Sequence, residues 1–140
     1  MKKRQIPVAV LFLAIVSCTN DNAVVPDRKA VGQSDITFLV TAPNTTPADG
    51  SVFVVGDFQG WDPGDPAYAL TQRPDDRWEI LLTLPEGTPI EFKFTRGSWA
   101  TIENELGGAE IPNRTVIPDD GQVHEFSVAS WADLGGLKGK

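Results

Sequence analysis

Short runs of alternating apolar and polar residues, each ended by a turn signal, limit this chain to a fold built from strands. In the first run Ile36, Phe38 and Val40 recur at every second position, which places them on one buried face of a β-strand. The sequence predicts six such strands, at residues 36–41, 51–55, 78–84, 90–95, 115–117 and 123–128. The second is apolar almost throughout and fits a strand that is buried on both faces.

Turn signals separate the predicted strands, and no stretch has a sustained helical period. Clusters of Gly, Pro and Asp lie between the runs, at residues 48–50, 63–66, 85–87, 106–108 and 118–121. Several short strands in about 100 residues are typical of a two-sheet sandwich. We therefore expect an all-β fold, an antiparallel immunoglobulin-like β-sandwich of six to eight short strands over residues 34–132, with a C-terminal tail at 133–140.

Composition excludes several classes of protein. The 140 residues are 41% hydrophobic and 22% charged, which excludes whole-chain disorder. A single Cys excludes a disulfide framework or a zinc finger, and a net charge of −7 argues against nucleic acid as a partner. Asp62 and Asp65 lack the further oxygen ligands that calcium needs, so they fit a tight turn better. We expect no metal and no cofactor.

The N-terminus resembles a bacterial lipoprotein signal. Basic residues 2–4 precede an apolar run at 6–16, which is too short to span a bilayer. The run ends in Ile15-Val16-Ser17-Cys18, which is similar to a lipobox, and Cys18 is the only Cys in the chain. We therefore expect a lipoprotein signal peptide at residues 1–17 and a lipid on Cys18. An ordinary secretory signal is the alternative.

Residues 18–33 are polar and aperiodic, and we expect them to be a flexible tether between lipid and domain. Acyl chains on Cys18 would hold the protein in the bacterial cell envelope, each buried methylene contributing about 0.8 kcal/mol. Thr19 follows the Cys, in place of the Asp that resembles an inner-membrane retention signal. The outer membrane is therefore the expected location, with the membrane face left open.

The sequence contains no catalytic constellation that rises above background. Glu103 and Glu105 lie two residues apart, and a glycosidase would use such a pair of carboxylates. Solvated charges on a hairpin are the favoured interpretation of both. His124 shares a strand face with Phe126, so we expect a partly buried side chain and not a general base. The chain is accordingly expected not to be an enzyme.

Two of the four tryptophans have no strand period that places them inside. Alternation puts Trp78 in the core, and Trp131 is expected at the edge of the sandwich. Trp61 lies in the Gly-rich loop 56–62, and Trp99 lies in or just after a turn. An exposed Trp is costly unless it binds something. Because a flat indole matches the C–H face of a pyranose ring, Trp61 and Trp99 predict a sugar-binding site.

A series of motifs in a fixed order resembles the starch-binding modules. The series runs through residues 56–62, 84–87, 90–94, Trp99 and 112–114. It is similar to family 20 carbohydrate-binding modules and to the related family 48 glycogen-binding domains, including that of AMP-activated protein kinase. In these families a loop Trp, a strand Lys, a second Trp and an Asn build one α-glucan site.

The resemblance implies a carbohydrate-binding site made of Trp61, Lys93, Trp99 and Asn113. Family 20 members place the second Trp shortly before the Asn, where this chain has residues 106–109 without an aromatic side chain. Family 48 members place it soon after the Lys, which matches Trp99. The second, Tyr-based site of family 20 is not carried over, because the corresponding positions are not aromatic.

The residues themselves agree with this site. Lys93 lies on the strand face opposite Phe92 and Phe94, so its amine faces outward. Asn113 offers a donor and an acceptor, which suits vicinal hydroxyls. Arg96 and Glu103 are weaker candidates for the rim of the site.

These inferences predict a non-catalytic, lipid-anchored module that binds an α-glucan such as starch, glycogen or a maltooligosaccharide. Any glycan-degrading activity is expected to come from a partner enzyme. Two alternatives stay open: a β-sandwich lipoprotein that binds a protein partner, and a small enzyme that uses Glu103 or Glu105.

Overall fold

Nine strands in three sheets make up the part of the chain that the computed structural model describes, residues 30–134. The strands are β1 (Gln33–Thr41), β2 (Phe53–Gly56), β3 (Thr71–Gln72), β4 (Trp78–Pro85), β5 (Ile90–Thr95), β6 (Glu103–Asn104), β7 (Arg114–Val116), β8 (Val123–Ser127) and β9 (Ser130–Trp131). Three short 3₁₀ turns join them, η1 (Asp57–Gln59), η2 (Pro66–Tyr68) and η3 (Trp99–Thr101). No α-helix occurs in the described residues, so the predicted all-β class is confirmed.

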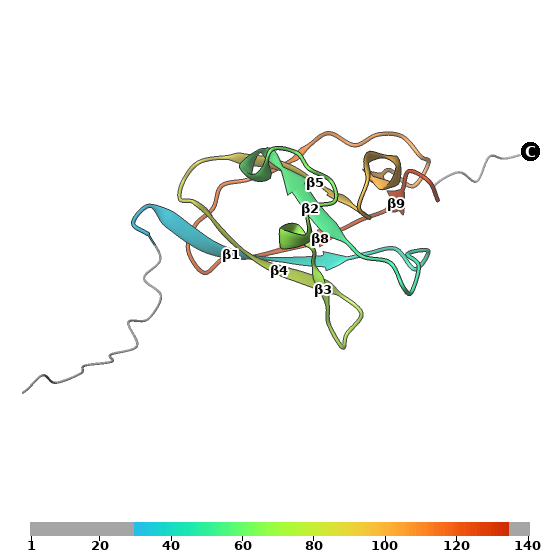
Figure 1. Cartoon of the computed structure of the whole chain (residues 1–140), viewed down its shortest axis with the longest axis horizontal. Helices are drawn as coiled ribbons and strands as arrows, with labels where there is room; N and C mark the ends of the chain where they lie inside the picture. The colour runs from blue at the N-terminus through green and yellow to red at the C-terminus, as the bar shows by residue number, and fades with distance from the viewer. Residues whose placement is uncertain (1–29, 135–140) are drawn as a thin grey trace, which may run out of the picture.

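Two larger sheets face each other across the core, and a small sheet closes one end. The strand orders are β3-β4-β1-β8, β2-β5-β7 and β6-β9. Figure 1 shows β2 and β5 in one layer and β1 and β4 in the other. Every pair is antiparallel except β1 and β8, which run parallel. The chain reaches β8 from β7 of the opposite sheet, so no hairpin forces β8 to run antiparallel to β1.

The core lies between the facing sheets and is filled by aromatic side chains. Phe38, Phe92 and Phe94 are all fully buried, and the Phe38 and Phe92 rings lie 4.7 Å apart. These are the every-second residues of β1 and β5, as the alternation predicts. Trp131 was expected at the sandwich edge but is fully buried, and its Nε1 donates to Thr46 Oγ1 at 2.8 Å.

Glu103 forms a buried ion pair, which corrects two expectations from the sequence. Only 1% of Glu103 is exposed, so it is neither a solvated hairpin charge nor part of a site rim. Its carboxylate accepts from Arg114 Nη2 at 2.8 Å and from Phe94 N at 2.9 Å. The Arg114 guanidinium also lies over the rings of Phe94 and Phe126, at 5.5 and 5.4 Å. The charge of Glu103 is therefore compensated inside the fold.

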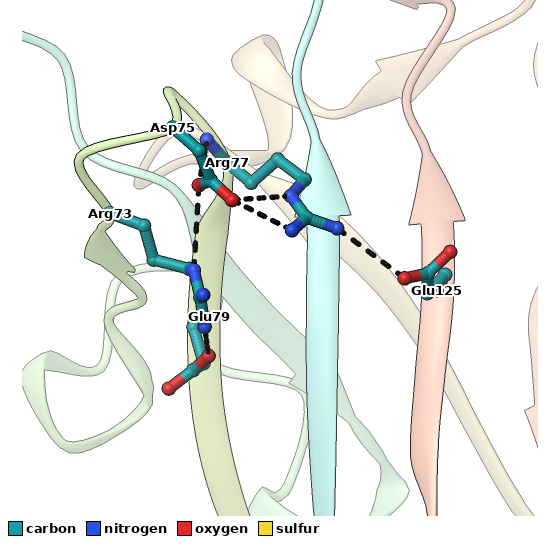
Figure 2. Close-up of polar contacts among 5 residues, drawn as sticks. All are labelled: Arg73, Asp75, Arg77, Glu79 and Glu125. Carbon is teal, nitrogen blue, oxygen red and sulfur yellow. Dashed lines mark hydrogen bonds and ion pairs between the residues drawn. The ribbon is translucent and has the colours of Figure 1, made fainter.

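A network of charged side chains covers part of the outer face of the β3-β4-β1-β8 sheet (Figure 2). Arg77 pairs with Asp75 at 2.7 Å and reaches across β1 to Glu125 of β8 at 3.4 Å. Leu39 of β1 faces the same side, between Glu79 and Glu125 in register, yet it is only 7% exposed. The Arg77 stem crosses β1 on this face (Figure 2), and we attribute the burial of Leu39 to it.

The same network shifts the protonation of Asp75. The hydrogen bond from the Arg77 side chain lowers the pKa of Asp75 below its ordinary value of 3.8. The carboxylate therefore stays charged, and paired with Arg77, to lower pH than an isolated Asp would.

The predicted signal peptide, Cys18 and the tether up to residue 29 lie outside the described residues, as does the tail beyond Leu134. Within residues 30–134 there is no helix with the length and apolar character that a membrane crossing requires.

Candidate functional site

The outer face of β5 organises the candidate site. Glu91, Lys93 and Thr95 point to the same side of this strand, because they alternate with the buried Phe92 and Phe94. Glu91 and Lys93 bond to the segment that precedes β7, and Thr95 bonds to the two loops that carry Trp61 and Trp99. The four predicted site residues lie on β5 itself or on these loops.

Glu91 and Lys93 hold the segment that precedes β7. Asn113 Nδ2 donates to Glu91 Oε2 at 3.0 Å, and Lys93 Nζ donates to the carbonyl oxygen of Ile111. An ammonium group has three donors, so Lys93 keeps N–H groups for a ligand. Asn113 is exposed. The structure therefore brings Lys93 and Asn113 to the same part of the surface.

Glu91 and the neighbouring Asp57 add carboxylates that sequence reasoning missed. Glu91 N donates to Asp57 Oδ2 at 3.1 Å, which ties η1 to β5. The position of Glu91, two residues before Lys93 on one strand face, is the signal that would have found it. Nothing in the sequence points to Asp57, because its contact with Glu91 spans 34 residues.

Trp61 follows η1 in a backbone conformation that is unusual for a bulky residue. Its φ is 62°, in the left-handed region, which costs about 1–2 kcal/mol for a residue with a Cβ. Three hydrogen bonds maintain this turn. Trp61 N donates to Gly56 O at 3.0 Å, Gln59 Nε2 donates to Asp62 O at 2.6 Å, and Asp62 N donates to Gln59 Oε1 at 2.6 Å.

Trp99 is the first residue of η3, just after β5. The turn is closed by Thr101 N donating to Ser98 O and Arg96 N donating to Thr101 O, both at 3.1 Å. The Trp99 side chain is 48% exposed, as the sequence predicts. Trp61 is partly buried, so for this residue the predicted exposure is only partial.

The two predicted tryptophans form a pair. Their ring centroids lie 6.4 Å apart and the ring planes are tilted by 31°. The loops beneath them touch as well, because a Cβ added to Gly64 would lie only 2.8 Å from Gly97 O. Two neighbouring indole faces offer the apolar platforms on which the rings of a sugar chain stack.

The other rim candidate, Arg96, is engaged elsewhere. Its guanidinium pairs with Asp133 and lies 5.7 Å from the ring centroid of Trp131, and its side chain is only 10% exposed. His124 is partly buried as expected, with its ring 6.0 Å from Phe38 and 6.2 Å from Phe126. In the part of the chain described here, no group of three His, Cys, Asp or Glu side chains is placed to hold a metal ion.

Residues 33–126 match the starch binding domain family. The chain belongs to this family. The resemblance expected from the motifs, with its β-sandwich fold, is therefore confirmed. The match runs from the first residue of β1 into β8, so it includes both sheets and both tryptophan loops.

Curated relatives of this starch-binding domain are much longer proteins. The chain is 41% identical over 118 residues to an α-amylase of Niallia circulans, a match that covers 84% of this chain and 9% of the relative. It is 43% identical over 105 residues to an amylopullulanase of Thermoanaerobacter thermohydrosulfuricus, covering 71% of this chain and 7% of the relative. The chain thus spans less than a tenth of the length of these relatives.

Solved structures share the fold. A family 15 glucoamylase from Hypocrea jecorina matches with a TM-score of 0.56 and 23% identity, over 71% of this chain and 18% of that one. A γ-cyclodextrin glucanotransferase from an alkalophilic Bacillus clarkii matches with a TM-score of 0.50 and 22% identity, over 69% of this chain and 15% of that one.

Proposed function

We propose that the surface around Trp61 and Trp99 binds an α-glucan such as starch, glycogen or a maltooligosaccharide. The observation that carries the proposal is the ring pair, 6.4 Å apart and tilted by 31°, in a member of the starch-binding domain family. Two tilted faces suit a curved α-1,4 chain better than a flat one. Stacking removes apolar area from water at about 25 cal/mol per Å².

Lys93 and Asn113 would complete this site by donating hydrogen bonds to sugar hydroxyls. Support comes from their common place beside the outer face of β5, where Lys93 Nζ contacts Ile111 O and Asn113 contacts Glu91. The site is open and has few polar groups. Binding is therefore expected to be weak, on the order of micromolar to millimolar Kd.

The chain itself is proposed to bind glucan without cleaving it. In support, Glu103, one of the two carboxylates considered for catalysis, is buried in its pair with Arg114. The names of the two relatives, an α-amylase and an amylopullulanase, support a glycan-degrading enzyme as the functional partner.

Affinity electrophoresis in a starch gel tests the binding site. We expect starch to retard the parent protein, and Trp61→Ala and Trp99→Ala to lose affinity by about tenfold each, since each removes one apolar platform. Leu81→Ala is the matched control, because Leu81 is 65% exposed on β4 of the opposite sheet. Equal mobility of the parent and the two Trp variants with and without starch would refute the proposal. Any detergent used to keep the protein in solution must lack a maltose headgroup, because such a headgroup would compete with starch for the site.

We also propose that a lipid on Cys18 anchors the protein, in the outer membrane of a bacterium. The support is sequence alone: the basic start, the apolar run at 6–16 and the Ile15-Val16-Ser17-Cys18 motif. Labelling cells with a fatty acid should mark the parent protein, and Cys18→Ser should be unlabelled and leave the membrane fraction. An unlabelled parent protein would contradict the anchor and leave the glucan site unaffected.

A further inference from the structure

We propose that the hydroxyl group of Thr95 fixes the separation of the Trp61 and Trp99 rings. Thr95 is the last residue of β5 and is fully buried. It is thus a positioning residue that acts through its neighbours and does not contact a ligand. The inference rests on the proposed function, since it concerns the two rings of that site.

A single oxygen atom joins the two loops that carry the rings. Thr95 Oγ1 donates to Pro63 O at 2.7 Å, two residues after Trp61. The same oxygen accepts from Gly97 N at 3.1 Å, two residues before Trp99. A hydroxyl has one hydrogen, and here Pro63 O takes it, so the two bonds have fixed and opposite directions.

The loops are also in contact at the backbone next to this hydroxyl. A Cβ on Gly64 would approach Gly97 O to 2.8 Å, closer than real Cβ atoms come. Each ring is therefore attached within two residues of a joint that is hydrogen-bonded and closely packed. The rings themselves extend to the surface, where Trp99 is 48% exposed, so contact between the rings alone does not define their spacing.

The spacing matters only for a ligand that covers both rings. A maltoheptaose chain long enough to stack on Trp61 and Trp99 benefits from rings that are already placed, because no loop has to be ordered on binding. Maltose, which covers about one ring, gains less from the joint. Thr95 is therefore expected to set the dependence of affinity on the length of the glucan.

The test compares three variants of the full chain. Thr95→Val keeps the shape of the buried side chain and removes both hydrogen bonds, and Thr95→Ser keeps the hydroxyl. Thr83→Val is the matched control, because Thr83 Oγ1 donates to Asp35 Oδ1 at 2.7 Å on the opposite sheet. Two readouts are taken: the exciton couplet of the Trp61–Trp99 pair in circular dichroism, defined by subtracting the Trp99→Ala spectrum, and the affinities for maltoheptaose and maltose by calorimetry.

We expect Thr95→Val to weaken the couplet and to lower maltoheptaose affinity by about tenfold, with a smaller effect on maltose. Thr95→Ser and Thr83→Val should keep the parent couplet and affinities. A folded Thr95→Val with the parent couplet would overturn the proposal. If Thr95→Val loses the couplet but the parent chain binds no glucan, the positioning role is supported and the proposed function is refuted.

Gly64→Ala keeps the proposal falsifiable if Thr95→Val does not fold. Its added Cβ has to push the Pro63 and Gly97 segments apart, because the nearest atom is a backbone oxygen. The couplet should then change without any change at Thr95. A folded Gly64→Ala with the parent couplet would show that the joint does not control the ring pair.

Discussion

At the scale of single residues, the Trp61 turn depends on the side chain of Gln59. The Gln59 side chain forms two hydrogen bonds with the backbone of Asp62. Trp61, which lies between these two residues in the sequence, has a positive φ. Such a conformation persists only where its surroundings determine it. The hydrogen bonds of Gln59 thus offset the free-energy cost of the strained backbone at Trp61.

Replacing Gln59 by Ala should therefore reduce glucan affinity more than it reduces stability. The Trp61 turn loses two hydrogen bonds of about 1 kcal/mol each, and part of that loss is recovered by relaxing the backbone. We expect maltoheptaose affinity to fall about fivefold, measured by calorimetry. Gln72→Ala is the control, since Gln72 is exposed on β3. Unchanged affinity in Gln59→Ala would show that the turn forms without this side chain.

Glu103 shows how a charged residue can belong to the core. Its carboxylate is 1% exposed, and Arg114 supplies the compensating charge. Glu103→Ala leaves Arg114 unpaired against the Phe94 ring, so the free energy of unfolding should fall by about 3 kcal/mol in a urea titration. Glu105→Ala, at an exposed position, should change it by less than about 0.5 kcal/mol.

The enzyme alternative predicts a different result. If the parent protein released sugar from starch and Glu103→Gln did not, that alternative would be favoured.

At the scale of elements, the longer strands were predictable because each repeats its pattern. The every-second apolar residues of β1, β4 and β5 lie in the core, except Ile80 of β4, which is partly buried and packs against it. The two-residue strands β3, β6 and β9 were not predicted, because two residues cannot display a period. The buried state of Glu103 was also invisible, since its partner is 11 residues away and meets it only in the folded chain.

The site was predictable to the extent that its residues stand out in the sequence. Trp61 and Trp99 are bulky side chains without a strand period, and the structure places their rings together. Thr95, Gln59 and Asp57 are ordinary polar residues in sequence. The contacts of Thr95 and Asp57 span 32 and 34 residues, so no local pattern reveals them, whereas Gln59 bonds to Asp62 only three residues further on.

The Arg77 stem crosses β1 on the outer face of the β3-β4-β1-β8 sheet (Figure 2), where Leu39 is only 7% exposed, and this gives a prediction about Arg77. Arg77→Ala removes the stem that crosses β1 and exposes Leu39 to water. We expect a loss of about 1 kcal/mol in the free energy of unfolding, measured in urea. Arg73→Ala is the control, because Arg73 pairs with Asp75 and Glu79 without crossing β1. An equal loss of unfolding free energy in the two variants would mean that Arg77 stabilises the fold by charge pairing and not by burying Leu39.

At the scale of the whole molecule, charge distinguishes the proposed ligand from a protein partner. The chain has a net charge of −7, so a charged partner would meet a strong field. An α-glucan is neutral, and its proposed contacts are ring stacking and short hydrogen bonds to Lys93 and Asn113. At 0.1 M, salt largely screens charges that are more than about 10 Å apart, whereas contacts between touching groups are much less sensitive to salt.

We therefore expect maltoheptaose affinity to change by less than about twofold between low and high salt, as measured by calorimetry. Lys93→Met should weaken binding by a similar factor at every salt concentration, since it removes a local hydrogen-bond donor and not a distant attraction. A partner that binds through the acidic surface would instead be released as salt rises. Strong salt dependence of maltoheptaose binding would mean that the ligand is recognised through the field of the whole protein, and the tryptophan pair would then no longer explain the affinity.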